Sequence, residues 1–129
     1  EDCTVLDELL GRYGEDWVEV FGEFEARRKP NAEAIADMAL ENYIEMRDAV
    51  RDPRFQLRKQ IAFELERRHP GRFIPRYSMV MFHPEIPYTE AQRRGAAQTA
   101  ILEELSRAAG RPDDVDFARA DALIRERLG

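Results

Sequence analysis

The sequence has almost no cysteine and no long apolar run. Cys3 is the only cysteine among 129 residues, so an internal disulfide is excluded and nothing points to an oxidising compartment. The longest apolar runs, such as residues 79–82, fall far short of the roughly 20 residues that cross a bilayer. No basic segment followed by apolar and small residues opens the chain, as a signal peptide would. We therefore expect a cytoplasmic protein that does not enter a membrane.

An excess of basic residues is also absent. The chain carries 20 Lys and Arg against 26 Asp and Glu, which gives a net charge of −6. Basic pairs such as Arg67-Arg68 have acidic neighbours, as is typical of solvated helix faces. Nucleic acid needs clustered and unopposed positive charge, so we expect no nucleic-acid partner.

The sequence offers little chemistry for a catalytic or metal site. His69 and His83 stand far apart beside prolines, without a Cys or carboxylate at ligand spacing, so no metal site is expected. No glycine-rich phosphate loop occurs, so we expect no cofactor-binding residue in this chain. No catalytic residue is predicted in it either.

Helical periodicity dominates what is present. Apolar residues recur at spacings of three and four, with only seven glycines and seven prolines to interrupt them. Pro30 is expected to stop one helix and Asn31 to cap the next. Thr89-Glu-Ala-Gln92 has the form of a capping box that starts a later helix. We expect a mostly α fold with about six helices, over about residues 5–10, 15–28, 32–51, 53–68, 89–109 and 117–128.

One segment departs from this pattern. Residues 73–82 are rich in aromatic, β-branched and Met side chains, and prolines at positions 70, 75, 84 and 87 flank them. Such a composition favours an extended conformation, although a lone strand forms no sheet by itself. We therefore expect one extended segment near 73–82.

Two polar residues stand out in apolar surroundings. Asn42 falls on the same predicted helix face as Ile35, Met38 and Met46, and its amide needs a partner, because burying it unpaired costs roughly 1–3 kcal/mol. Tyr77 lies in the extended segment and its hydroxyl also needs a partner. A satisfied core amide and an ordinary packed tyrosine explain both residues; a ligand site is the alternative.

Several blocks of the sequence resemble kynurenine 3-monooxygenases. They are NAEAIADMALENYIEMRD at 31–48, HPGRFIPRYSMVMF at 69–82 and IPYTEAQRRG at 86–95. The opening EDCTVLDELL looks like the helix that follows the flavin-contacting segment in this family. The resemblance covers about residues 1–105, and its two central blocks are specific to this family rather than to flavin hydroxylases generally.

The resemblance implies an activity and a set of site residues. Such enzymes bind FAD, take electrons from NADPH and use O2 to hydroxylate L-kynurenine to 3-hydroxykynurenine. In the family, an Asn and a Tyr that match Asn42 and Tyr77 contact the amino-acid end of the substrate. A Met that matches Met46 lines the same pocket, and Glu45 matches a position close to it. An amide and a phenol can both donate to a carboxylate, and a Met side chain forms an adaptable apolar wall.

The resemblance also implies that the chain is the carboxyl-terminal part of a larger α/β flavoprotein. Residues 1–29 are expected to continue from the flavin domain, and 30–129 to form a helical, substrate-side domain. The flavin domain is then the chain's partner, and the chain alone is expected to be inactive. Its end resembles the soluble bacterial members rather than those with a membrane anchor. The alternative is a non-catalytic helical interaction module derived from this family, with the first helix available for a homodimer.

Overall fold

The computed structural model describes residues 1–49 and 51–129. This described part contains six α-helices and no strand, which confirms the mostly α fold with about six helices. The α-helices are α1 (Asp2–Tyr13), α2 (Trp17–Ile44), α3 (Pro53–Arg68), α4 (Arg76–Phe82), α5 (Tyr88–Ala108) and α6 (Phe117–Arg127). A π-helix, η1 (Glu45–Ala49), continues α2 directly, and a 3₁₀ turn, η2 (Pro112–Asp114), precedes α6.

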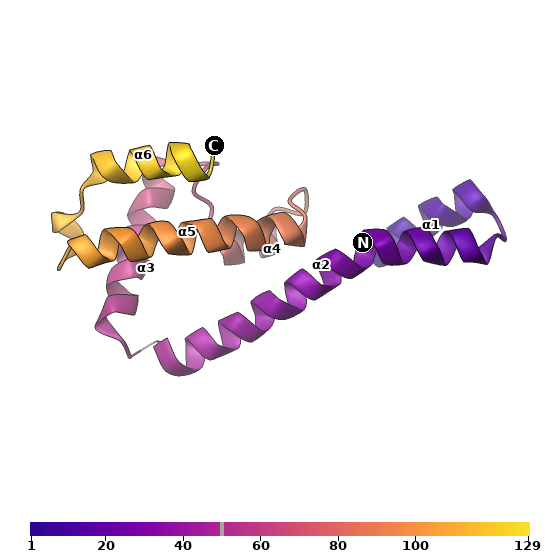
Figure 1. Cartoon of the computed structure of the whole chain (residues 1–129), viewed down its shortest axis with the longest axis horizontal. Helices are drawn as coiled ribbons and strands as arrows, with labels where there is room; N and C mark the ends of the chain where they lie inside the picture. Colours follow the sequence, from indigo (N-terminus) through magenta and orange to yellow (C-terminus); the bar gives the residue numbers. More distant parts are fainter. Residues whose placement is uncertain (50) are drawn as a thin grey trace.

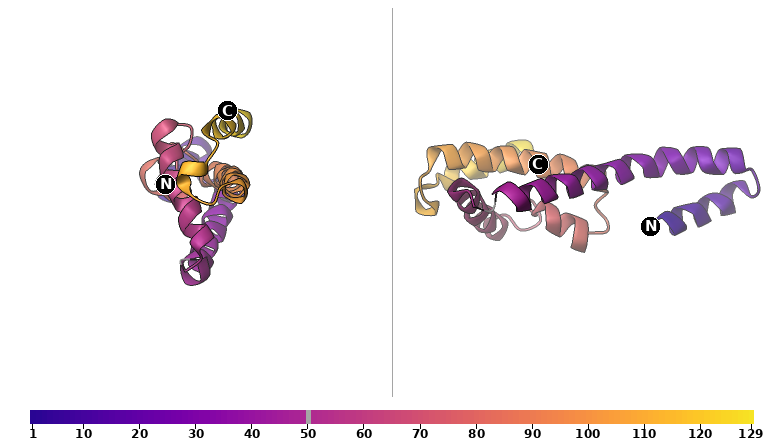
Figure 2. Two further views of the ribbon diagram at one scale, coloured as in Figure 1. Left: turned by 90° about the vertical axis from the view of Figure 1, so that its left-hand side faces the viewer. Right: turned by 90° about the horizontal axis from the view of Figure 1, so that it is seen from below.

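Helix α2 connects two parts of an elongated molecule (Figure 1). Helix α1 folds back along the first half of α2, and the two form a hairpin that projects from the rest. Helix α5 lies beside the second half of α2, and α3, α4 and α6 all pack on α5 (Figure 2). No helix within the described ranges combines the length and the apolar character needed to cross a membrane.

Pro30 does not end a helix, which corrects the sequence prediction. Helix α2 begins after Asp16, whose carboxylate accepts a hydrogen bond from the Glu19 N–H at 3.3 Å, and it runs through Pro30 without a break. A proline inside a helix removes one backbone hydrogen bond. Here the turns before it pack on α1 and the turns after it pack on α4 and α5, so tertiary packing outweighs the local signal. The expected domain boundary at residue 30 falls inside this helix and remains a prediction.

Asn31 caps a helix, but not the one that follows it in sequence. Its side-chain oxygen accepts hydrogen bonds from the Thr89 N–H at 3.2 Å and from the Thr89 hydroxyl at 3.4 Å. Thr89 is the second residue of α5, where backbone N–H groups have no partner within the helix. The predicted capping box is therefore wrong: Pro87 occupies the N-cap position, and Gln92 Nε2 donates to Asp37 at 3.4 Å.

The segment 73–82 is not extended along its whole length, which corrects the prediction of one extended segment there. Residues 73–75 lack helical structure, and α4 takes up the remainder. A strand needs a neighbouring strand to satisfy its backbone, and the described residues offer none, whereas a helix satisfies its own. Met79 of α4 is fully buried in a cluster with Met38 of α2 and Ala91 of α5. This packing selects the helix.

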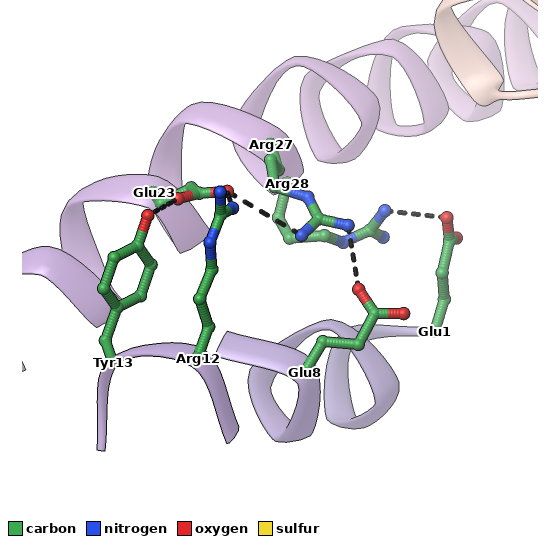
Figure 3. Close-up of polar contacts among 7 residues, drawn as sticks. All are labelled: Glu1, Glu8, Arg12, Tyr13, Glu23, Arg27 and Arg28. Atoms are coloured by element: carbon green, nitrogen blue, oxygen red, sulfur yellow. Dashed lines mark hydrogen bonds and ion pairs between the residues drawn. The ribbon is translucent and has the colours of Figure 1, made fainter. Parts of the chain in front are cut away.

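Charged side chains bridge the α1–α2 hairpin (Figure 3). Arg28 of α2 pairs with Glu1 at 2.9 Å and with Asp2 at 2.5 Å. Glu23 accepts a hydrogen bond from the Tyr13 hydroxyl at 2.5 Å. The apolar contribution is small, because the cluster between the two helices has three buried members within the described residues: Val5, Leu9 and Val20.

The largest core lies between α3, α5 and α6. Partly buried side chains from the same helices and their connections surround it. Its fully or nearly buried members are Ile61, Leu65, Phe73, Ile101, Leu105, Ala109, Val115, Ala120, Leu123 and Ile124. Helix α5 contributes both to this core and to the contact with α2, so it holds the region around α4 in place.

Candidate functional site

The four residues that the family resemblance singles out lie on two segments, the end of α2 with its continuation η1, and α4. Asn42 is in the last turns of α2, Glu45 and Met46 are the first residues of η1, and Tyr77 is the second residue of α4. The π-helical turn is a local feature that occurs often at functional sites. The site is therefore built from the end of α2 together with a short helix that lies more than thirty residues later in the sequence.

Arg76 joins these two elements. Its guanidinium donates a hydrogen bond to Glu41 and lies 3.8 Å from a carboxylate oxygen of Glu45. Glu41 is in α2 and Glu45 begins η1, so both acceptors come from the element that carries Asn42. The structure thus brings the segment of Tyr77 up to the segment of Asn42 and Met46.

The predicted burial of Asn42 is wrong for this chain. Met38 of the same stripe is buried, but Asn42, Tyr43 and Met46 are exposed, so the described residues leave these three side chains largely uncovered. Tyr77 is exposed as well, with 65% of its surface accessible. In the described ranges, neither the Asn42 amide nor the Tyr77 hydroxyl makes a hydrogen bond. A satisfied core amide and a packed tyrosine therefore do not explain these residues.

Apolar side chains are exposed on the same two elements. A large contiguous group of such side chains is typical of a surface that another molecule or domain covers. The guanidinium of Arg47 lies over the ring of Tyr43, 5.8 Å from its centroid. Besides the site residues, the large exposed apolar residues on the last turns of α2 and on α4 are Leu40, Tyr43, Ile44, Met81 and Phe82.

The segment that carries Tyr77 is anchored to α5 by Gln98 and by close packing at Gly95. Gln98 is a buried polar residue of α5, and its Nε2 donates to the backbone oxygen of Ile74 at 2.8 Å. Gly95 of α5 lies directly against the side chain of Arg76. A glycine inside a long helix indicates that another group approaches the helix closely, but the sequence does not show that this group is Arg76.

The clearest electrostatic feature near this region is on the first turns of α5. Hydrogen bonds from Arg93 and Arg94 lower the pKa of Glu90 to about 2. Glu90 is therefore ionised at neutral pH and committed to its two arginines, so it offers no general acid or base. An amide, a phenol, a thioether and a paired carboxylate can bind and orient a ligand through hydrogen bonds and packing.

The two histidines have local partners. His69 Nε2 lies 2.7 Å from the Asp121 carboxylate and so links the end of α3 to α6. His83 Nδ1 lies 2.8 Å from Glu85 in the loop after α4. A hydrogen bond from the Glu85 backbone N–H, and then the bond with His83, lower the pKa of the Glu85 carboxyl. Over the part of the chain that the structure covers, no group of three potential ligands could hold a metal ion.

Comparison with known proteins gives close relatives along the whole chain. It is 52% identical over 128 residues to a kynurenine 3-monooxygenase of Myxococcus xanthus and 45% identical over 128 residues to one of Stenotrophomonas maltophilia. A third, from Flavobacterium johnsoniae, is 42% identical over 105 residues. The matches cover 99%, 99% and 81% of this chain but only 27%, 28% and 23% of the relatives. The chain thus spans about a quarter of their length. No family model matches the chain.

These relatives define the class first: each is a monooxygenase by name, so the chain is related to the oxygen-inserting oxidoreductases. More narrowly, these relatives are all named kynurenine 3-monooxygenase, and the chain is similar along its whole length to one segment of them. The resemblance stated from the sequence is thereby confirmed.

Proposed function

We propose that this chain is the carboxyl-terminal, substrate-side portion of a flavin-dependent kynurenine 3-monooxygenase. The complete enzyme hydroxylates L-kynurenine to 3-hydroxykynurenine with NADPH and O2 in the cytoplasm. The observation that carries the proposal is the 52% identity over 128 residues to a relative of that name. The exposure of Asn42, Met46 and Tyr77 supports it, because a substrate that lies between this chain and the flavin domain must touch side chains the chain leaves uncovered.

Each site residue has a distinct role in this proposal. The Asn42 amide and the Tyr77 hydroxyl donate hydrogen bonds to the carboxylate of L-kynurenine. Met46 packs against the apolar part of the ligand, as an adaptable thioether can. Glu45, already paired with Arg76 at 3.8 Å, borders the site without binding the substrate directly.

The cofactor lies with the flavin domain, outside this chain. FAD supplies the oxygen chemistry when bound and NADPH supplies the electrons. The chain has no glycine-rich phosphate loop and is therefore expected neither to hold FAD nor to react alone. Its contribution is to bind and orient the substrate and to exclude water from the side that it covers.

The experiment is steady-state kinetics of the complete enzyme with Asn42→Ala and Tyr77→Phe. A hydrogen bond to a charged group contributes about 1.5–3 kcal/mol, so each change is expected to raise the KM for L-kynurenine by roughly ten- to a hundredfold. Oxidation of NADPH should also become uncoupled from hydroxylation.

Tyr13→Phe is the matched control, because it removes the same hydroxyl from the distant hairpin, where it binds Glu23. It should leave the KM unchanged. If both Asn42→Ala and Tyr77→Phe kept the parent KM and coupling, these residues would not belong to the substrate site.

The alternative of a non-catalytic interaction module draws support from the exposed aromatic pair Trp17 and Phe21 on the hairpin. The two proposals predict different masses and different flavin contents for the native polypeptide. An intact mass several times that of this chain, with visible flavin absorbance, supports the enzyme. A colourless, folded monomer of 129 residues supports the module.

A further inference from the structure

The side chain of Arg76 crosses α5 at its only glycine. A Cβ atom built on Gly95 would lie 2.6 Å from Cδ, 3.1 Å from Cγ and 3.2 Å from Cβ of Arg76. The stem of the arginine therefore occupies the space that any other side chain at position 95 would need. A glycine weakens a helix by about 1 kcal/mol relative to alanine. The missing side chain at Gly95 leaves the space through which Arg76 reaches α2.

The guanidinium of Arg76 ends between two carboxylates one helical turn apart. It donates a hydrogen bond to Glu41 and lies 3.8 Å from Glu45, and only 24% of its side chain is exposed. Two negative charges face one positive charge, so the arginine is not available to bind a further carboxylate. It acts as a link between helices.

The three members of this link each stand next to a residue of the proposed site. Glu41 precedes Asn42, Glu45 precedes Met46 and Arg76 precedes Tyr77. A rigid link between Arg76 and the two glutamates therefore holds the backbone of all three site residues in place relative to one another. We propose that Arg76 is a positioning residue, which holds Tyr77 on α4 at a set distance from Asn42 and Met46; this inference rests on the proposed function.

Helix α4 needs such an anchor. It has seven residues, and helices this short are not stable by themselves in water. Gln98 holds the segment before it against α5, and Met79 packs against Met38 and Ala91. Arg76 adds the polar connection to the turns of α2 that carry Asn42.

The test is kinetics of the complete enzyme with Arg76→Met, Glu41→Gln and Tyr77→Phe, alone and combined. Arg76→Met keeps the stem over Gly95 and removes the charge. Loss of a partly buried ion pair of this kind is expected to raise the KM for L-kynurenine about three- to tenfold, with kcat nearly unchanged. Arg76→Lys should recover part of the loss. Glu41→Gln should act in the same direction, and the Arg76→Met/Glu41→Gln pair should be no worse than Arg76→Met.

The decisive comparison is made in the Tyr77→Phe background. A residue that acts through the Tyr77 hydroxyl has nothing left to position there, so Arg76→Met should raise the KM no further. Arg93→Met, which removes an arginine paired with Glu90 on the surface of α5, is the matched control and should leave the KM unchanged.

The outcomes separate the two proposals. A raised KM for Tyr77→Phe together with a parental KM for Arg76→Met and Glu41→Gln overturns the positioning role and leaves the proposed function intact. The positioning role is also overturned if the double variant raises the KM by the product of the two single fold-changes, because Arg76 then acts independently of Tyr77. A parental KM for both Tyr77→Phe and Asn42→Ala rejects the site itself, and the positioning role with it. If Arg76→Met fails to fold, the surface change Glu41→Gln provides the same comparison.

Discussion

The α1–α2 hairpin and the bundle of α3, α5 and α6 are held together by different means. Among the described residues, the bundle has a core of ten buried side chains from three helices and their connections. The hairpin has three and relies on charged pairs across its two helices, such as Arg27 with Glu8 at 3.1 Å (Figure 3). Exposed ion pairs contribute about 0–1 kcal/mol each, whereas burial of a large aliphatic side chain contributes about 1.5–3 kcal/mol. The bundle therefore supplies most of the chain's stability.

The hairpin also leaves apolar surface uncovered. Trp17 and Phe21 stack at 5.5 Å between ring centroids, and each is about half exposed. A stacked aromatic pair on an arm with little core of its own is typical of a surface that packs against something else. The two regions therefore differ in that the bundle buries its large apolar side chains within the chain, whereas the hairpin leaves an aromatic pair about half exposed.

The largest effect is expected from matched leucine deletions in the two regions. Leu65→Ala in the bundle and Leu9→Ala in the hairpin both remove a fully buried side chain and cost about 2–5 kcal/mol where they act. Because Leu65 belongs to a core shared by three helices, its loss should lower amide protection throughout α3, α5 and α6. Leu9→Ala should lower protection in α1 and the first turns of α2 alone. Hydrogen exchange of the complete protein, followed segment by segment, measures both.

The comparison would fail if Leu9→Ala lowered the protection of α5 and α6 as much as Leu65→Ala does. The two regions would then unfold as one cooperative unit. The continuous backbone of α2 would be the only route for that coupling, since α1 makes its main contacts with α2.

A smaller effect is expected from removing a charged bridge in each region. Arg28 joins Glu1 and Asp2 across the hairpin with only 11% of its side chain exposed. Arg119 pairs with Glu104 at 2.8 Å on the bundle, where its side chain is 53% exposed. Arg28→Met should lower the protection of α1 by about 1 kcal/mol, and Arg119→Met should change α6 by less than about 0.5 kcal/mol. Equal losses in the two segments would show that the hairpin does not depend on its charges more than the bundle does.

The sequence predicted the number of helices better than their limits. Spacings of three and four identify the helical segments because each helix needs one apolar face. Pro30 and the composition of 73–82 misled because they are local signals, whereas the outcome depended on distant packing. Met79 is buried against Met38 and Ala91, and no local pattern shows that a seven-residue segment will find those two partners.

At the candidate site, too, the sequence predicted some features and the fold determined others. The resemblance assigned roles to Asn42 and Tyr77, and these assignments remain predictions. The periodicity of α2 predicted Asn42 in a buried stripe, but this face is exposed from about that residue onwards. A helical pattern shows which face is apolar and does not show how far along it a neighbouring helix packs. The link from Arg76 to Glu41 spans 35 positions of sequence. Only the fold could reveal it.

The smallest effect concerns acid stability and belongs to the bundle. Hydrogen bonds from Arg67 and Arg68 lower the pKa of Glu64 from 4.5 to about 2. Between these two values the unfolded chain binds a proton at this position that the folded chain does not, so the stabilisation is complete above the ordinary pKa and is lost as the pH falls towards 2. Glu64→Gln should therefore make amide protection in α3 fall less steeply over this pH range. Glu66→Gln is the control on the same helix, because Glu66 forms no ion pair within the described residues. Identical slopes for the parent and Glu64→Gln would show that the two arginines do not hold this carboxylate in solution, and that this ion pair adds nothing to the acid stability of the bundle.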